Sequence, residues 1–332
     1  MDVAALVSAN IVSSVSLIAL NKRLVASGFR FILFLSALHF GTGYVFLLAA
    51  SQSEGPRLFR RPPPGVVPRV AILALAAAGA ASICVTNASL RYNSMGTYQI
   101  IKVSVLPATM VITLLEGVGR PTLREALAAA LVVLGTLLCI GADVRATAFG
   151  LALGAAGVVS TALYQVWQGR VQKEHSLGGA QALLLLSLPQ ALMTLAASSV
   201  MEVDVLARLA GKDVNGDLAA HAFSMGELAL LAATCAAAVV LNYSTIAVIG
   251  RTSAVTMQFA AQAKTALILL LDAVLNPRAV ALPPEKAIAR AIGLVCIFGG
   301  VAWYSRERQL IASAAAGATA RSTTSAGLKS PV

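Results

Sequence analysis

A lysine lies in the middle of a long apolar stretch, where a charged side chain needs a reason to be kept. Lys264 belongs to the stretch NYSTIAVIGRTSAVTMQFAAQAKTALILLL, residues 242–271, and lies eleven residues after residue 253, where an apolar run begins. At the centre of a membrane helix a lysine costs about 2.5–3.5 kcal/mol, so it is normally paired or lines a polar cavity. The carboxylates considered as partners fall near the ends of apolar runs: Glu116, Asp143 and Asp272. We therefore favour a cavity role over a carboxylate-paired or snorkelling lysine.

A second lysine, Lys102, ends a stretch that matches the surroundings of Lys264. The stretches TNASLRYNSMGTYQIIK (86–102) and LNYSTIAVIGRTSAVTMQFAAQAK (241–264) both begin with Asn-x-Ser and continue through Thr-x-Gln to a lysine. The matching pairs are Asn87 and Asn242, Ser89 and Ser244, Thr97 and Thr256, Gln99 and Gln258, and Lys102 and Lys264. The spacing from glutamine to lysine differs between the two, so the symmetry is not strict, and chance similarity is the alternative interpretation.

The offset between the two stretches predicts an inverted repeat. The first lies between the third and fourth apolar runs and the second between the eighth and ninth, so the second copy enters the membrane in the opposite sense. Inverted repeats typically build a substrate site near the bilayer midplane, at their interface. We expect repeat one to cover about residues 1–145 and repeat two about residues 146–305.

These residue types suit a phosphorylated ligand. Two lysines facing one cavity would attract phosphate, each close contact contributing ~4 kcal/mol at an effective dielectric near 20 before desolvation. Polar and aromatic neighbours could stack on a base or hydrogen-bond sugar hydroxyls and a pyrimidine edge. These neighbours are Asn87, Tyr92, Tyr98, Asn242, Tyr243 and Gln258. Tyrosines near span ends also act as interface anchors, so that role stays open for them.

The composition is that of an all-α membrane protein. Of 332 residues 58% are hydrophobic and 12% charged, where soluble domains carry about 25% charged residues. The apolar runs predict ten transmembrane helices in one domain over residues 1–310, and a disordered tail over 311–332. The predicted spans are 3–22, 31–50, 69–88, 95–115, 124–142, 147–168, 180–200, 226–247, 253–274 and 287–304. We expect the first run to be a span and not a cleaved signal peptide, because no convincing cleavage site follows it.

The net charge of +11 is explained by membrane topology and not by nucleic-acid binding. The side with more basic residues faces the cytosol, which places both termini there and requires an even number of spans. That side has 13: Arg57, Arg60, Arg61, Arg69, Arg120, Arg124, Arg170, Lys173, Arg251, Arg306, Arg308, Arg321 and Lys329. The other side has nine: Lys22, Arg23, Arg30, Arg91, Arg145, Arg208, Lys212, Arg278 and Lys286.

The sequence does not favour an enzyme, a metal site or a cofactor. A membrane-embedded transferase or hydrolase would need a nucleophile with a base or clustered metal ligands, but His39 is isolated and neither HExxH nor GxSxG is present. The four cysteines lie in apolar stretches without CxxC spacing, and Gly150, Gly154 and Gly157 are interpreted as a helix-packing face.

Several stretches together resemble one transporter family. NIVSSVSLIALNKRL (10–24), FRFILFLSALHF (29–40), GGAQALLLLSLPQA (178–191) and the two stretches around the lysines are similar to the nucleotide-sugar and triose-phosphate transporters of the drug/metabolite transporter superfamily. The resemblance implies a ten-helix fold with two inverted five-helix repeats. It also implies that Lys22, Lys102 and Lys264 line a central cavity.

The residue after the ninth-span lysine narrows the resemblance. Sugar-phosphate members carry a second basic residue there, whereas Lys264-Thr265 is similar to the plant and algal branch that carries UDP-galactose, UDP-rhamnose or UDP-xylose. A neutral Thr265 suits a diphosphate between base and sugar, and a second cation suits a terminal phosphate. Phe259 and Gln262 depart from the family's pattern, so the choice of sugar is left open.

The resemblance implies an antiporter that moves a UDP-sugar into the Golgi lumen in exchange for UMP. Its partners would be these two substrates and the lipid bilayer, with no nucleic acid and no cofactor, and a homodimer is one assembly considered. The alternatives are a sugar-phosphate/phosphate antiporter and a non-transporting membrane accessory protein.

Overall fold

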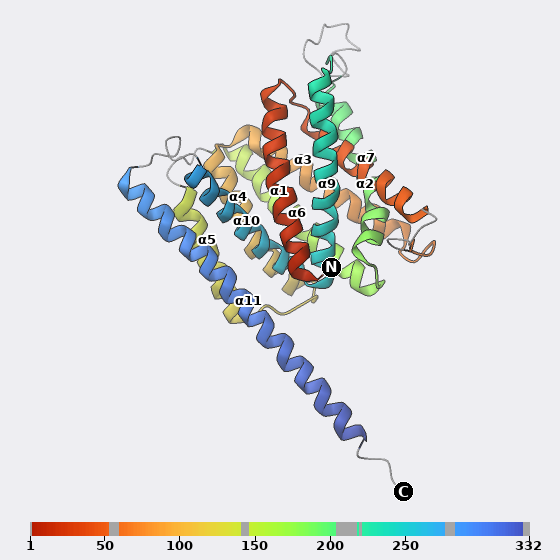
Figure 1. The fold of residues 1–332 in the computed structure, drawn as a ribbon, viewed down its shortest axis with the longest axis vertical. Coiled ribbons are helices and arrows are strands. Elements are labelled where there is room, and N and C mark those ends of the chain that lie inside the picture. Colours follow the sequence, from red (N-terminus) through yellow and green to blue (C-terminus); the bar gives the residue numbers. More distant parts are fainter. Residues whose placement is uncertain are drawn as a thin grey trace. The chain divides into compact units, whose positions relative to one another are not determined.

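The computed structural model describes residues 2–52, 60–140, 146–203, 218, 221–275 and 283–327, and these form ten helices without a named strand. Figure 1 shows their arrangement along the chain. The helices are α1 (Val3–Ala26), α2 (Ile32–Gln52), α3 (Arg69–Tyr92), α4 (Met95–Leu115), α5 (Leu123–Ile140), α6 (Ala148–Glu174), α7 (Gly179–Met201), α9 (Met225–Arg251), α10 (Ala254–Leu275) and α11 (Pro284–Gly327). Each matches one predicted apolar run, which confirms an all-α protein.

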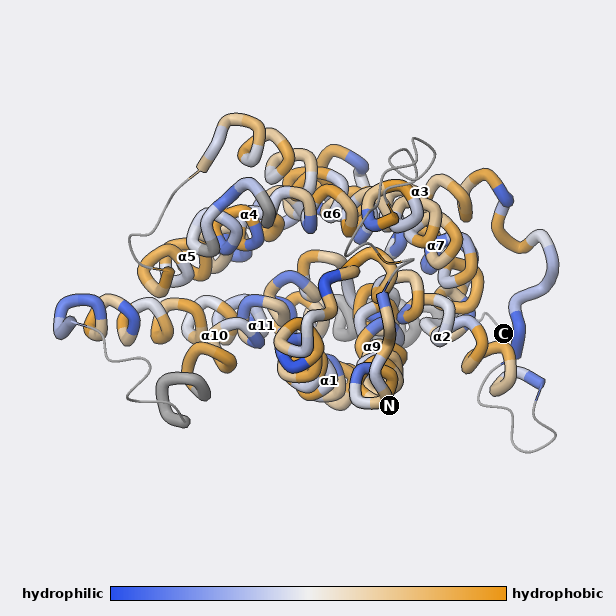
Figure 2. Tube along the Cα trace, turned by 90° about the horizontal axis from the view of Figure 1, so that it is seen from above, coloured by the Kyte–Doolittle hydropathy of each residue, from blue (hydrophilic) through white to orange (hydrophobic). Residues whose placement is uncertain are grey.

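Length and composition fit a membrane for every helix but one. Nine of the described helices are long and apolar enough to cross a bilayer, and α10 contributes a shorter apolar segment, Ala254–Leu270. Figure 2 shows hydrophobic residues distributed over the helices, with hydrophilic residues between them. With no water in the bilayer core, a helix satisfies its backbone hydrogen bonds internally, which is why such runs fold as helices. The chain is therefore a multi-span membrane protein.

Short polar side chains fix where several helices begin. Asp2 Oδ1 accepts a hydrogen bond from the backbone N–H of Ala5 at 2.7 Å, and Thr147 caps α6 in the same way. At α9, Ser224 and Glu227 form a reciprocal capping box. Such caps satisfy backbone N–H groups that have no partner inside the helix.

The chain divides into two compact units, each considered by itself. The first comprises Met1–Val118 and Ala142–Ala261, and the second comprises Gly119–Gly141 and Gln262–Val332. In the first unit α1 packs on α9, α3 on α6 and α2 on α7. Counted in chain order, α9 is the eighth of the ten helices. Moving five places along this order, and returning to the first helix after the tenth, turns α1 into α6 and α9 into α3. The α1–α9 pair thus becomes the α6–α3 pair, and the α2–α7 pair becomes itself. These helix pairs of the first unit are therefore unchanged by a shift of five helices.

Glycines on α6 allow close helix packing in the first unit. A Cβ added at Gly154 would collide with the side chain of Ile101 on α4, and one added at Gly157 would meet Thr86 on α3 at 3.0 Å. The predicted packing role of this glycine face is confirmed.

The second unit is built around α5 and α11. Gly135 and Gly293 let the two backbones approach so closely that a Cβ at either would contact the carbonyl oxygen of the other at 2.6 or 2.5 Å. Near one end of the pair, Arg308 lies 3.5 Å from the buried carboxylate of Glu125.

The stretch for which the sequence predicts a disordered tail continues α11 as helix to Gly327. Its alanines explain the difference, because alanine has the highest helix propensity and favours helix even where no apolar face is present. Residues 328–332 of the predicted tail lie outside the described residues.

Candidate functional site

The two matching stretches begin their second helices with the same local structure. At α4, Ser94 Oγ accepts a hydrogen bond from the Thr97 backbone at 3.3 Å, and the two hydroxyls lie 3.1 Å apart. At α10, Ser253 and Thr256 make the same two contacts at 3.1 and 3.0 Å. The similarity between the two stretches therefore includes the capping serine and extends from Thr-x-Gln to Ser-x-x-Thr-x-Gln.

The serines of the two Asn-x-Ser triplets occupy equivalent packing positions. Ser89 on α3 is fully buried and donates to the carbonyl of Gly150 on α6 at 3.4 Å. Ser244 on α9 is also fully buried and accepts from Asn10 on α1 at 3.1 Å. Each serine thus joins the third helix of one predicted repeat to the first helix of the other.

Lys102 lies inside α4 beside an aromatic ring. Its ammonium nitrogen is 5.0 Å from the centre of the Tyr98 ring, one helical turn earlier. Among the described residues Lys102 makes no ion pair, and its side chain is exposed. A cation over a ring face gains a modest electrostatic attraction and keeps its N–H donors for another ligand.

Six further predicted residues lie in the first unit, and several keep their polar atoms available. Lys22 is exposed on α1, and Gln99 and Asn242 are half-buried on α4 and α9. No described residue is a side-chain hydrogen-bond partner of Lys22, Asn87, Tyr98, Gln99, Asn242 or Tyr243. Tyr243 instead packs its ring against two apolar clusters that include Ala247 and Leu183.

Gln258 has a partner that the sequence did not reveal. Its side chain is 6% exposed, and its Nε2 donates to Oε1 of Gln165 on α6 at 2.7 Å. Gln165 belongs to no repeated motif, so the contact arises from helix packing alone.

Lys264 and Thr265 lie on α10 in the second unit, where both are half-buried. Consecutive residues on a helix point about 100° apart, so the two side chains face different directions. The structure thus assigns Lys264 and Lys102 to different units.

A cavity of about 240 Å³ lies beside Asn87 in the first unit. It is lined by Arg30, Ile32, Leu33, Cys84, Asn87, Ala88, Met201 and Glu202. The carboxylate of Glu202 accepts hydrogen bonds from the backbone of Leu33 at 2.8 Å and Phe34 at 2.9 Å, so it caps α2. This cavity brings a predicted residue together with a cation and an anion.

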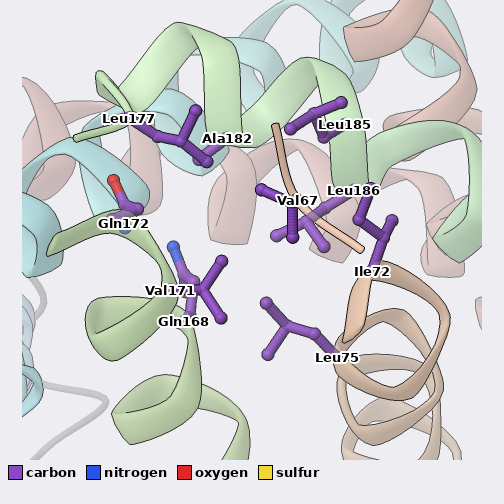
Figure 3. A pocket seen from close by; sticks show the side chains of 10 residues that line it. All are labelled: Val67, Ile72, Leu75, Gln168, Val171, Gln172, Leu177, Ala182, Leu185 and Leu186. Carbon is purple, nitrogen blue, oxygen red and sulfur yellow. The ribbon is translucent and has the colours of Figure 1, made fainter. Parts of the chain in front are cut away.

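A second cavity is too small for a substrate. It lies among α3, α6 and α7, has a volume of about 10 Å³, and is lined by leucine and valine side chains with the amides of Gln168 and Gln172 (Figure 3). A water molecule needs roughly this much room, so the space fits one water at most. Gln168 is 1% exposed and neither of its amide atoms has a partner.

The described residues hold no group of three or more His, Cys, Asp or Glu that could bind a metal ion. All four cysteines are free. The predicted residues supply lysines, amides and tyrosines on membrane helices, and such groups can bind a ligand.

Comparison with known proteins gives the family. No family model matches the chain. It is 32% identical over 269 residues to UDP-rhamnose/UDP-galactose transporter 1 of Arabidopsis thaliana, covering 79% of this chain and 72% of the relative. UDP-xylose transporter 3 of the same plant is 28% identical over 81% of this chain and 71% of its own length. UDP-rhamnose/UDP-galactose transporter 3 is 30% identical over 91% of this chain and 81% of its own length.

The fold also matches a solved structure. One crystal structure superposes with a TM-score of 0.61 at 19% identity, covering 93% of this chain and 98% of the other. That likeness concerns the fold, and the sequence identity to the plant relatives carries the assignment. The chain belongs to the nucleotide-sugar transporter family.

Proposed function

We propose that the chain is an antiporter that moves a UDP-sugar of the galactose, rhamnose or xylose class into the Golgi lumen in exchange for UMP. The observation that carries the proposal is the identity to transporters named for these UDP-sugars, over four-fifths of the chain. The lysines on the membrane helices give it a chemical basis, because both exchanged substrates are phosphate anions.

In this proposal Lys102 and Lys264 bind the phosphates, with Lys22 as a third cation. Lys102 lies over a ring and has no carboxylate partner among the described residues, which leaves its charge available to a phosphate. Amides suit the ribose and base, and Asn87, Gln99, Asn242 and Gln258 supply them, with Tyr98 and Tyr243 as aromatic surfaces. Thr265, in place of a second cation, favours a diphosphate over a terminal phosphate.

Alternating access would follow from the two five-helix repeats. The equivalent serine caps of α4 and α10, and the equivalent contacts of Ser89 and Ser244, support a repeat of this kind. Rocking of one repeat against the other would expose the site to each side in turn. Strict exchange has a physical reason: an empty site in which no anion neutralises the charge of Lys102 should cross slowly, since charge inside the membrane is costly.

The test is uptake into proteoliposomes preloaded with UMP. Labelled UDP-galactose, UDP-rhamnose, UDP-xylose, a GDP-sugar and triose phosphate are supplied outside, one at a time. The proposal predicts UMP-dependent uptake of at least one UDP-sugar and none of the GDP-sugar. Uptake of triose phosphate alone would identify a sugar-phosphate antiporter, and well-folded protein that takes up nothing would be a non-transporting accessory protein.

A further inference from the structure

The helix α7 connects two ends of the first unit that differ in how tightly they are packed. It begins at Gly179, where an added Cβ would lie 2.8 Å from the Cβ of Ala247 on α9. It ends at Met201, which lines the cavity of about 240 Å³ together with Asn87 on α3. Its 23 residues correspond to roughly 35 Å along a helix axis. We call the end where α6 and α9 finish the Gln172 end, and the end where α3 finishes and α2 begins the Asn87 end.

At the Gln172 end, hydrogen bonds join α6 to α9 at two points. Gln172 is 3% exposed, and its Nε2 donates to the carbonyl oxygen of Ile246 at 3.2 Å. The next residue, Lys173, donates from Nζ to the carbonyl oxygen of Thr252, the C-cap of α9, at 3.0 Å. Because the start of α7 also packs against α9 here, this end of the unit is closed.

Gly250 on α9 makes the room that the Gln172 amide occupies. A Cβ added at Gly250 would collide with this amide and would lie 2.9 Å from its Cδ, so a side chain at this position would displace it. The amide oxygen of Gln172 is buried and has no hydrogen-bond partner among the described residues. A buried acceptor without a partner is unfavourable, and water satisfies it once the helices separate. The contact therefore closes the end without holding it permanently shut.

The corresponding contacts are not formed at the Asn87 end. A shift of five places in chain order turns α6, α7 and α9 into α1, α2 and α3, so closure there would need α1 and α2 to pack on α3. In the described part of the chain, α2 makes only a slight contact with α3, and α1 makes no extended contact with it. The cavity lies between α2 and α3 instead, lined by Ile32, Leu33 and Asn87 among others. This end of the unit is open.

We propose that Gln172 and Gly250 form the latch of a transport gate that is closed in this structure, while the cavity beside Asn87 belongs to the opposite, open gate. A substrate passes the Gln172 end only after the Gln172 amide separates from the carbonyl of Ile246. As that end opens, α1 and α2 pack on α3 and the cavity closes. The inference rests on the proposed transport function and adds to it the residues that hold one side shut.

Distances between pairs of spin labels test the latch in the full-length protein in lipid vesicles. The parent protein has its four cysteines replaced by alanine. One label pair replaces Glu174 and Arg251, which are exposed at the Gln172 end of α6 and α9. The other replaces Ile32 and Tyr92, which are exposed at the Asn87 end of α2 and α3. Pulsed electron paramagnetic resonance gives the distance distribution of each pair in the absence of nucleotide.

Gln172→Glu removes the hydrogen bond and almost preserves the size of the side chain, because an ionised carboxylate cannot donate to the Ile246 carbonyl. At about pH 7.5 it should raise the ratio of long to short distances at the Gln172 end at least about fivefold, the change that corresponds to one neutral hydrogen bond. The distance at the Asn87 end should become shorter. At about pH 4.5 protonation returns an O–H donor and should move both distributions back toward those of the parent, measured over the same pH range.

Gly250→Ala tests the same latch without adding a charge. Its methyl group displaces the Gln172 amide, so it should shift both distances in the same directions. Gly226→Ala is the matched control, because it is the same change near the other end of α9, where the added Cβ has Ser224 Oγ as its nearest neighbour at 3.9 Å. The control should leave both distances unchanged. Thermal unfolding of each variant shows that it is folded before distances are compared.

Two results would overturn the inference. Folded Gln172→Glu and Gly250→Ala variants with the parent's distances at the Gln172 end would show that these residues are no latch. A longer distance there without a shorter one at the Asn87 end would show local fraying and contradict a gate. Since no nucleotide is present, the result is independent of uptake: both predicted shifts in a protein that takes up no UDP-sugar would support the gate and reject the proposed substrate alone.

Discussion

At the scale of single residues, the placement of Lys102 explains how a membrane helix can keep a charge. The ammonium lies 5.0 Å from the centre of the Tyr98 ring, so the electrostatic attraction of the ring partly stabilises the charge in place of a carboxylate. A carboxylate partner would neutralise the site permanently. A ring partner leaves the cation able to take up and release an anionic substrate.

Replacing Lys102 by glutamine should weaken UMP binding by about tenfold or more, because a hydrogen bond to a charged group contributes roughly 1.5–3 kcal/mol. Lys102→Arg should recover part of the loss, since it restores the charge in a different geometry. Competition for labelled UMP uptake gives both affinities. Unchanged affinity in the glutamine variant would remove Lys102 from the site.

The sequence revealed some candidate site residues and missed the partner of one of them for a physical reason. Lys102 and Lys264 were found because a charge in an apolar run is locally anomalous. Gln165 was not, because its pairing with Gln258 depends on how α6 packs, and no local pattern records that contact.

At the scale of helices, the same cap starts α4 and α10. Ser94 and Ser253 each accept from the backbone three residues later, although the two helices belong to different halves of the chain. In both helices Thr-x-Gln follows the capping serine, so each glutamine lies five residues after its cap. The cap thus positions Gln99 and Gln258 alike.

Ser94→Ala and Ser253→Ala should each lower the free energy of unfolding by about 1 kcal/mol, the usual value of an N-cap side chain. Ser305→Ala is the control, because Ser305 lies inside α11 and bonds its own helix's carbonyl at Val301. Thermal unfolding in detergent compares the three. Equal midpoints for all variants and wild type would show that these serines do not cap.

The contact between α4 and α6 can be tested with a compensating pair. Gly154→Val should destabilise the protein by roughly 1–3 kcal/mol, because the added atoms meet Ile101. Ile101→Ala opens space at the same point and should recover part of that loss in the double variant. Strict additivity of the two changes, measured by unfolding in detergent, would contradict direct packing between these residues.

The number and order of helices could be predicted from the sequence, but some helix ends could not. Each of the ten apolar runs corresponds to one helix, because a helix needs about 20 apolar residues to span a bilayer. The runs did not show that α11 continues to Gly327, since that extension is alanine-rich and not apolar enough to be counted as a span.

At the scale of the whole molecule, the cost of moving the charge of Lys102 across the membrane without an anion predicts coupled exchange. UMP-loaded proteoliposomes without external substrate should lose UMP at least about tenfold more slowly than with external UMP, since a lysine in the membrane without a counter-charge costs more than the 1.4 kcal/mol that corresponds to a tenfold rate. Equal efflux with and without external UMP would show a uniporter and remove the role assigned to the lysines in coupling.

The central claim is that the lysine in the ninth span is kept to hold phosphate, and one comparison tests it most directly. UMP-loaded proteoliposomes are made with wild-type protein, with Lys264→Ala and with Lys286→Ala, which removes an exposed lysine near the start of α11. We predict that the Lys264 variant folds and loses UDP-sugar uptake at least a hundredfold, whereas the Lys286 variant transports like the wild type. Wild-type uptake by a folded Lys264→Ala protein would contradict the claim.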